Sequence, residues 1–253
     1  VLGYGRRYEG AANDDVDGDA HLIRGQVHSP LGESGFNLGA YLALYTSSDA
    51  KLAGSDVKGD HNIFLGAVEF SGKVSSLDIY SEAGFATGTM DVPVTHEVEG
   101  SDPSYSVYEK DLSGFYIMGG TSVAVGQITL GFEGGFATGD DDPLDDKDEG
   151  FTAVNSDFWL GQVLHDEGLI LRTNGNSGGL SNILYGQVTA AVKPTDKLSL
   201  NAGLLYLKPV EKIISGFTGK EADTYGMELF GTIAYQLADS LAYKLYWGYA
   251  IPD

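Results

Sequence analysis

The stretch Gln127-Ile-Thr-Leu-Gly-Phe-Glu-Gly-Gly-Phe-Ala-Thr-Gly139 alternates in character at every position, and this alternation decides the fold. One set of alternate positions holds Ile128, Leu130, Phe132, Gly134 and Phe136. The other set holds Thr129, Gly131, Glu133, Gly135 and Ala137. A period of two, with large apolar residues on one side and an acid among small residues on the other, predicts a half-buried strand.

The same alternation recurs along the chain and predicts about 11 strands. Their expected ranges are 1–7, 19–29, 36–47, 61–73, 77–90, 111–125, 127–139, 181–193, 197–210, 224–238 and 241–251. Most are longer than the roughly 5–6 residues usual in soluble sheets. They suit tilted strands that cross a bilayer, which need about 9–11 residues.

The expected connections alternate between short and long. Long connections fall at 8–18, 48–60, 91–110, 140–180 and 211–223. Strict alternation places every long loop at one end of the sheet, as in outer-membrane barrels with short periplasmic turns and longer extracellular loops. The sequence therefore predicts an all-β, antiparallel transmembrane β-barrel that forms a single domain over 1–253. Since such barrels normally have an even strand number, we expect at least 12 strands in the full protein and an incomplete chain here.

Composition excludes several other classes. The formal net charge is -21, which argues against nucleic-acid binding because phosphates demand a basic surface. The chain has no Cys, so it has neither disulfides nor thiolate metal sites. It contains no run of 18 apolar residues and therefore predicts no transmembrane helix. No signal peptide is visible at Val1, so we expect a mature chain or one that begins internally.

The polar faces of the expected strands predict the lining of a pore. The candidate pore-lining residues are Arg24, Gln26, His28, Glu69, Asp78, Glu82, Glu133, Lys193, Glu228 and Lys244. Acids outnumber bases in this set, so we expect the pore to favour cations or neutral solutes. The alternative for Arg24, Gln26 and His28 is that they pair with acids and stiffen the wall.

The segment 140–180 is too long for a simple connector. Its apolar part either folds into the barrel as a constriction or packs outside as an extracellular loop. In the first case the candidate constriction residues are Asp157, Trp159, Asp166, Glu167 and Arg172.

Two acidic runs are candidate Ca²⁺ sites, because Ca²⁺ takes clustered oxygen ligands. Their candidate ligands are Asp140, Asp142, Asp145, Asp15, Asp17 and Asp19. The run from Asp15 to Asp19 lacks the distal Glu of an EF-hand loop. The alternatives are a solvated, self-repelling loop and divalent ions that bridge the loops to lipopolysaccharide. No other cofactor is expected.

The stretch from Gly135 to about Leu164 resembles the alginate-export-type outer-membrane barrels. The matching residues are Gly139, Asp140, Asp142, Pro143, Asp145, Lys147, Phe151 and the run Asp157-Phe-Trp-Leu-Gly161. The resemblance implies an outer-membrane channel. An exporter of polyanionic alginate would be expected to line its pore with Arg and Lys, whereas this chain has an acidic predicted lining.

The sequence thus predicts an outer-membrane porin for passive or facilitated diffusion of small polar solutes or cations. Its expected partners are outer-membrane lipid, lipopolysaccharide and the solute, with a homo-oligomer or an envelope complex as further possibilities. The alternatives are a barrel that acts as a sheath in an envelope complex, such as an electron-transfer conduit, and a soluble all-β binding protein. A hydrolase built on Ser177 is the remaining alternative, and we expect no enzymatic activity.

Overall fold

The computed structural model describes residues 2–7, 19–32, 35–51, 58–96, 104–142, 145–151, 160–164, 180–214 and 221–251. Long strands dominate these ranges. The strands of the main sheet are β1 (Leu2–Arg7), β2 (Asp19–Pro30), β3 (Asn37–Lys51), β4 (Lys58–Val74), β5 (Leu77–His96), β6 (Ser104–Val125), β7 (Ile128–Ala137), β9 (Ile183–Thr195), β10 (Leu198–Lys208), β13 (Gly226–Ala238) and β14 (Leu241–Ile251). Three strands of two residues each complete the set: β8 (Lys147–Asp148), β11 (Ile213–Ile214) and β12 (Glu221–Ala222).

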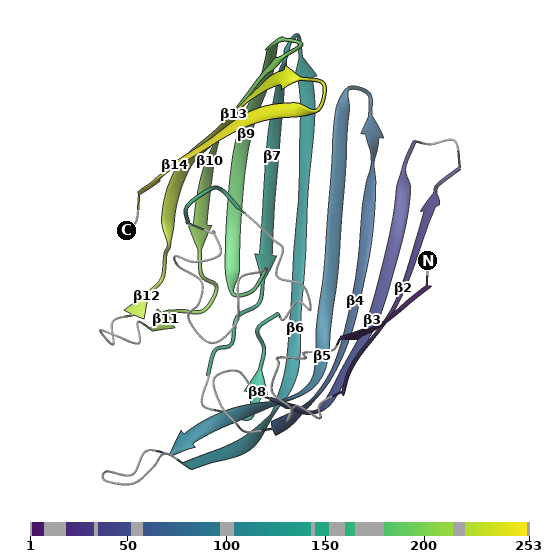
Figure 1. Ribbon diagram of the computed structural model, residues 1–253, viewed down its shortest axis with the longest axis vertical. Coiled ribbons are helices and arrows are strands. Elements are labelled where there is room, and N and C mark those ends of the chain that lie inside the picture. The colour runs from purple at the N-terminus through teal and green to yellow at the C-terminus, as the bar shows by residue number, and fades with distance from the viewer. Residues whose placement is uncertain are drawn as a thin grey trace.

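Each long strand pairs antiparallel with the next long strand along the chain, so the sheet is a meander from β1 to β14 (Figure 1). Within the described ranges, β1 and β14 pair with one neighbour each and form the two edges. The short β8 lies parallel to β6, and β11 and β12 form a separate two-stranded sheet. No helix in the described part of the chain is long and apolar enough to cross a membrane.

The outer face of the sheet is apolar and exposed. Val27 is 68% exposed, Phe132 55% and Val188 50%. Exposed apolar side chains continue across the other strands, including Ile23, Leu42, Phe64, Phe85, Phe115, Ile117, Leu130, Leu229, Leu245 and Trp247. A continuous apolar face of this extent marks a surface that meets lipid or another protein rather than water.

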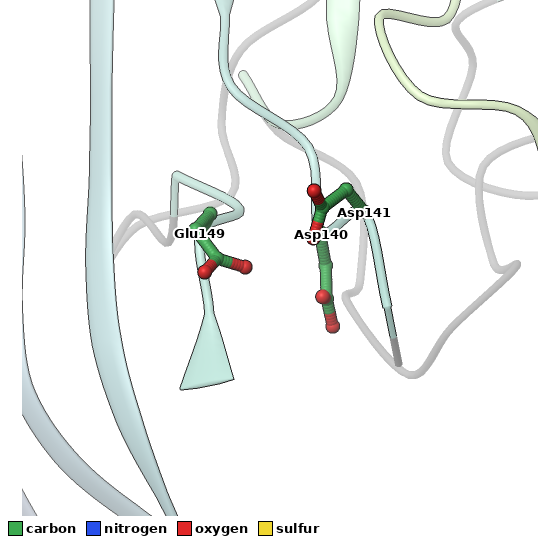
Figure 2. A group of neighbouring side chains, drawn as sticks. All are labelled: Asp140, Asp141 and Glu149. Atoms are coloured by element: carbon green, nitrogen blue, oxygen red, sulfur yellow. The ribbon is translucent and has the colours of Figure 1, made fainter. Parts of the chain in front are cut away.

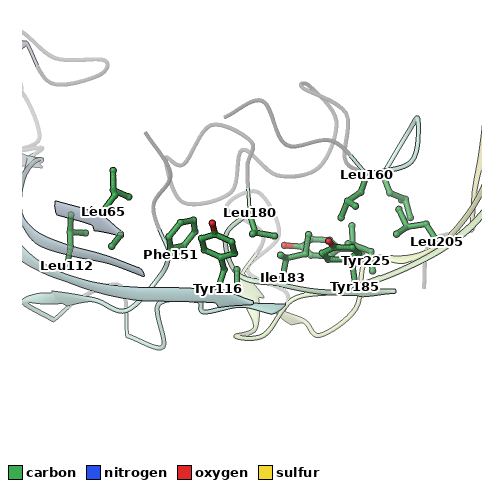
Figure 3. Close-up of a cluster of buried hydrophobic side chains, with 14 of the residues drawn as sticks. Leu65, Leu112, Tyr116, Phe151, Leu160, Leu180, Ile183, Tyr185, Leu205 and Tyr225 are labelled. Atoms are coloured by element: carbon green, nitrogen blue, oxygen red, sulfur yellow. The ribbon is translucent and has the colours of Figure 1, made fainter. Parts of the chain in front are cut away.

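The inner face carries the buried core. Figure 3 shows Leu65, Tyr116 and Tyr185 on one side of the curved sheet, with Phe151 beside Tyr116 and Leu160 above Tyr185. Phe151 and Leu160 belong to the long connection between β7 and β9, which therefore folds against the inner face. The core therefore lies on one side of a single sheet, and the other side is the exposed apolar face.

The predicted all-β, antiparallel fold class is confirmed, and each predicted strand has an observed counterpart. The main difference is length at the end with the long connections. β5 continues to His96 and β6 begins at Ser104, whereas the sequence predicts a loop over 91–110. These extensions pair with each other residue by residue from Asp91↔Glu109 to His96↔Ser104. Pro93 lies within the β5 extension, and a proline inside a run argues against a strand, so the sequence favours a loop there although the two extensions pair.

Candidate functional site

The predicted pore-lining residues all lie on the inner face of the sheet. Residues directly opposite each other on antiparallel strands point to the same side. The register joins Gln26 to Tyr41 and Ala67, and Glu69 to Glu82 and Met118. Further pairs and the alternation along each strand extend this face to Glu133, Lys193, Glu228 and Lys244. The sheet thus separates a charged inner wall from an apolar outer wall.

Two carboxylates face each other across neighbouring strands on this wall. Glu69 of β4 lies directly opposite Glu82 of β5. Like charges in such a position repel and destabilise the pair of strands. His28 Nδ1 lies 2.6 Å from Glu69 Oε1, and the Tyr116 hydroxyl donates a hydrogen bond to Glu82 Oε1. These partners reduce the repulsion, and a cation held between the two carboxylates would reduce it further.

A third carboxylate, that of Glu133, is held by two tyrosines. Tyr80 donates its hydroxyl to Glu133 Oε2, and the Tyr185 hydroxyl lies 3.0 Å from Glu133 Oε1. Both tyrosine rings lie over glycines of the adjacent strand, Tyr80 over Gly120 and Tyr185 over Gly135. Because a glycine leaves the space that a Cβ would fill, the ring lies flat on the sheet and its hydroxyl reaches along the wall. The carboxylate is thereby fixed in orientation.

Glu228 plays a different part from the other acids. Its side chain is 0% exposed, and it accepts three backbone N–H groups from the segment 160–164, which we call the inner segment. The nitrogens of Gln162 and Val163 lie 2.6 Å and 3.1 Å from Oε1, and that of Leu164 lies 2.8 Å from Oε2. Glu228 was predicted to line the pore; it lies on the inner face, where it anchors a turn of the chain against the wall.

Two glycines permit this close approach. Gly161 has φ +68°, a conformation that L side chains rarely adopt, and a Cβ on it would lie 2.5 Å from Glu228 Oε2. A Cβ on Gly248 of β14 would lie 2.6 Å from the Val163 side chain. The inner segment therefore fits against the sheet only because both positions lack a side chain.

The remaining predicted lining residues lie nearer the short turns. The Asp78 carboxylate lies 3.3 Å from Lys73 Nζ, and both side chains are more than half exposed, so the pair adds little stability. Gln26 and His28 contact each other through their side-chain nitrogens. Lys193 and Lys244 are exposed on the inner face of β9 and β14. The short-turn end of the wall is thus wetter than the end covered by the inner segment.

At the end with the long connections, Lys110 is buried at 7% exposure. Its Nζ lies 3.3 Å from Asp140 Oδ2 and 3.1 Å from the Lys147 carbonyl oxygen, so it ties β6 to the segment after β7. Asp148 lies beside this ion pair, and its Oδ1 accepts the Gly150 N–H at 2.9 Å. Burial raises the pKa of Asp148 above its ordinary value, although the Gly150 hydrogen bond opposes the shift.

The acidic loop brings together a set of carboxylates different from the predicted one. Asp140, Asp141 and Glu149 each place a carboxylate oxygen within 4.8 Å of the others (Figure 2). Asp145 instead caps a turn, because its Oδ1 accepts the Lys147 N–H at 2.8 Å. Calcium binding stays a prediction. Of the second predicted site, Asp15 and Asp17 lie outside the described residues, as does the Asp19 side chain.

The predicted constriction residues also lie outside the described ranges; these are Asp157, Trp159, Asp166, Glu167 and Arg172. The described parts of the same connection, Phe151 and residues 160–164, do pack on the inner face. Sequence reasoning missed the tyrosines that hold the carboxylates, Tyr80, Tyr116 and Tyr185. The available signal was their place in the alternation, because each tyrosine belongs to the inward-facing positions of its strand, and the acids occupy those positions too.

The fold and its two faces define an antiparallel β-sheet of the outer-membrane barrel type. The chain is similar to the solved structure of OmpT, an outer membrane protein of Vibrio cholerae folded in vitro, with a TM-score of 0.39 and 10% identity over 98% of this chain and 83% of that chain. No family model and no curated protein matches the chain. The resemblance to alginate-export-type barrels therefore stays a prediction.

The prediction that the chain is not an enzyme does not stand. One fold hosts unrelated functions, catalysis among them, so a sheet of the outer-membrane barrel type gives no ground for excluding an enzyme. Ser177, on which the hydrolase alternative rests, lies outside the described residues.

Proposed function

We propose that this chain forms an outer-membrane channel through which small polar solutes pass, with a preference for cations. The observation that carries the proposal is the contrast between the two faces of the sheet. The outer face exposes large apolar side chains, as lipid contact requires, while the inner face carries Glu69, Glu82 and Glu133. A wall with fixed negative charge raises the local concentration of cations and lowers that of anions.

The inner segment and Phe151 narrow the space beside this wall. Leu160 and Leu164 are almost completely buried against the inner face, and Glu228 holds the turn between them. A segment fixed inside a barrel sets the effective width of the path and so the size of solute that passes. We therefore propose small solutes rather than polymers such as alginate.

Conductance in a planar bilayer tests the proposal. Purified protein should give discrete current steps, and a salt gradient should give a reversal potential of the sign expected for cation selectivity. Replacing the wall charges, Glu82→Gln with Glu133→Gln, should move the cation-to-anion permeability ratio toward unity. Glu109→Gln is the control for the loss of one such charge, since Glu109 is exposed on the outer side of the β6 extension, away from the wall, and each single wall variant should shift the ratio more than this control does.

A second candidate function is a barrel that encloses or supports a partner in an envelope complex. The filling of part of the inner face by Phe151, Leu160 and Leu164 favours it. A sheath of this kind gives no ion current by itself, so the same bilayer measurement separates the two functions.

A further inference from the structure

We infer that a cavity on the inner face of β2 to β6 binds short zwitterionic peptides, or peptide-like solutes of the same charge pattern, through an apolar side group. The inference rests on the proposed function in one respect, namely that the channel would give solutes access to the site. It names a class of solute that neither the fold nor the comparisons assign.

The cavity has a volume of about 490 Å³. This lies in the range of about 300–1,000 Å³ that is usual for small-molecule sites. Its apolar lining includes Leu65 and Ala67 of the sheet and Phe151 and Leu180 of the connection between β7 and β9. Phe151 packs on Tyr116 with ring centroids 4.6 Å apart. The cavity is thus bounded by sheet on one side and by folded connection on the other, and it suits an apolar group.

Two opposite charges at the cavity have no ionic partner among the described residues. Arg24 of β2 lines the cavity and makes none of the ion pairs found there. Glu82 of β5 accepts the Tyr116 hydroxyl, which is neutral, whereas the neighbouring Glu69 has His28 at 2.6 Å. A ligand carrying both a carboxylate and an ammonium group supplies the missing partner to each. Charge-assisted hydrogen bonds of this kind are the strong ones.

The register gives the spacing of these two charges. Arg24 shares a row of the sheet with Leu65, whereas Glu82 shares one with Glu69, which lies four residues further along β4. At about 3.3 Å per residue, the two rows are roughly 13 Å apart along the strands. Three strand intervals at about 4.8 Å add roughly 14 Å across the sheet. Long side chains close part of this span, and a ligand whose charges are several bonds apart closes the rest better than a single α-amino acid.

The test uses four ligands with one body, namely alanyl-phenylalanine, its C-terminal amide, its N-acetyl form and the doubly blocked form. In that order, the four ligands carry both charges, the positive charge alone, the negative charge alone and no charge. Binding is measured by titration calorimetry on the folded, detergent-solubilised protein. The zwitterion should bind roughly tenfold or more tightly than either singly charged form, given the usual worth of a hydrogen bond to a charged group.

Two variants assign the charges to residues. Arg24→Gln should abolish the preference for the zwitterion over the amide, since both then offer only a usable ammonium. Glu82→Gln should abolish the preference for the zwitterion over the N-acetyl form. Lys197→Gln, in the exposed turn between β9 and β10, is the control and should change neither preference. A variant that merely perturbed folding would weaken all four ligands together, and that result would overturn the assignment.

The ligand series on the unaltered protein decides the inference even if a variant fails to fold. Equal affinity for all four forms, or tighter binding of the amide than of the zwitterion, overturns it. Conductance without zwitterion binding overturns this inference and leaves the channel standing. Zwitterion binding without conductance overturns the channel and supports the site.

Discussion

Glu228 gives the sharpest test of how the inner segment is held. In Glu228→Gln, one carboxylate oxygen becomes an NH₂ group, which cannot accept the backbone N–H groups that point at it. One or two of the three hydrogen bonds, at 2.6 Å, 3.1 Å and 2.8 Å, are therefore lost. Because the side chain is 0% exposed, water does not replace them, and each buried group left unpaired costs about 1–3 kcal/mol.

The expected local cost is thus about 2–4 kcal/mol. At 1.4 kcal/mol for each factor of ten, the opening equilibrium of the inner segment should rise roughly 30- to 700-fold. Hydrogen exchange read by mass spectrometry measures this directly, because the amides of Gln162, Val163 and Leu164 lose their acceptors on opening. Strands that do not contact the segment, such as β4, should keep their protection.

Glu221→Gln is the matched control. Glu221 is exposed, and its Oε2 lies 2.7 Å from Lys212 Nζ, so its partner is not in the inner segment. It should leave the exchange of residues 162–164 unchanged. If Glu228→Gln also left their exchange unchanged, the hydrogen bonds to Glu228 would not hold the segment, and the reasoning would be refuted.

Three further predictions concern the outer face and the acidic loop. Leu130→Arg, at a site 46% exposed on the outer face, should lower the free energy of unfolding in lipid vesicles by about 2–4 kcal/mol, whereas Thr129→Arg on the inner face should be tolerated. Lys110→Met should lower the free energy of unfolding, measured by urea titration, by about 3–5 kcal/mol, because it leaves the largely buried Asp140 carboxylate without its cation, and an unchanged midpoint would contradict that role. Burial raises the pKa of Asp148 in the folded state, so the folded protein binds the proton more tightly than the unfolded chain, and stability should fall as pH rises from the ordinary Asp value to this raised one. Asp148→Asn should flatten that part of the stability profile between the two pKa values, as read by thermal unfolding, and an unaltered slope would rule Asp148 out as its source.

Much of the sheet is predictable because a single sheet with one apolar face and one polar face leaves a strong pattern. In β7, Ile128, Leu130 and Phe132 alternate with small and polar residues, so both the strand and its faces follow from the sequence. The extensions of β5 and β6 do not, since Pro93 lies within the β5 extension and a proline argues against a strand, whereas pairing between the two strands holds the extensions in place.

The candidate site is predictable only as a face. Alternation places Glu82 and Glu133 on the inner wall, but pairing between strands decides that Tyr116 reaches one and that Tyr80 and Tyr185 reach the other. Register depends on the whole set of neighbouring strands, so it is not written in any one of them.

Glu228 shows the same limit from another side. Its place in β13 predicts an inward carboxylate, and that is where it lies. Its role as an anchor depends on a turn more than 60 residues earlier in the chain, where Gln162 and Leu164 present their N–H groups. A long-range contact between a side chain and a backbone turn leaves no local pattern in sequence.

The reversal potential of single channels in a planar bilayer under a potassium chloride gradient tests the central claim most directly. The acidic inner wall predicts discrete conductance steps whose reversal potential shifts toward the equilibrium potential of potassium. A shift toward the equilibrium potential of chloride, or the absence of any current from folded protein, would contradict the account.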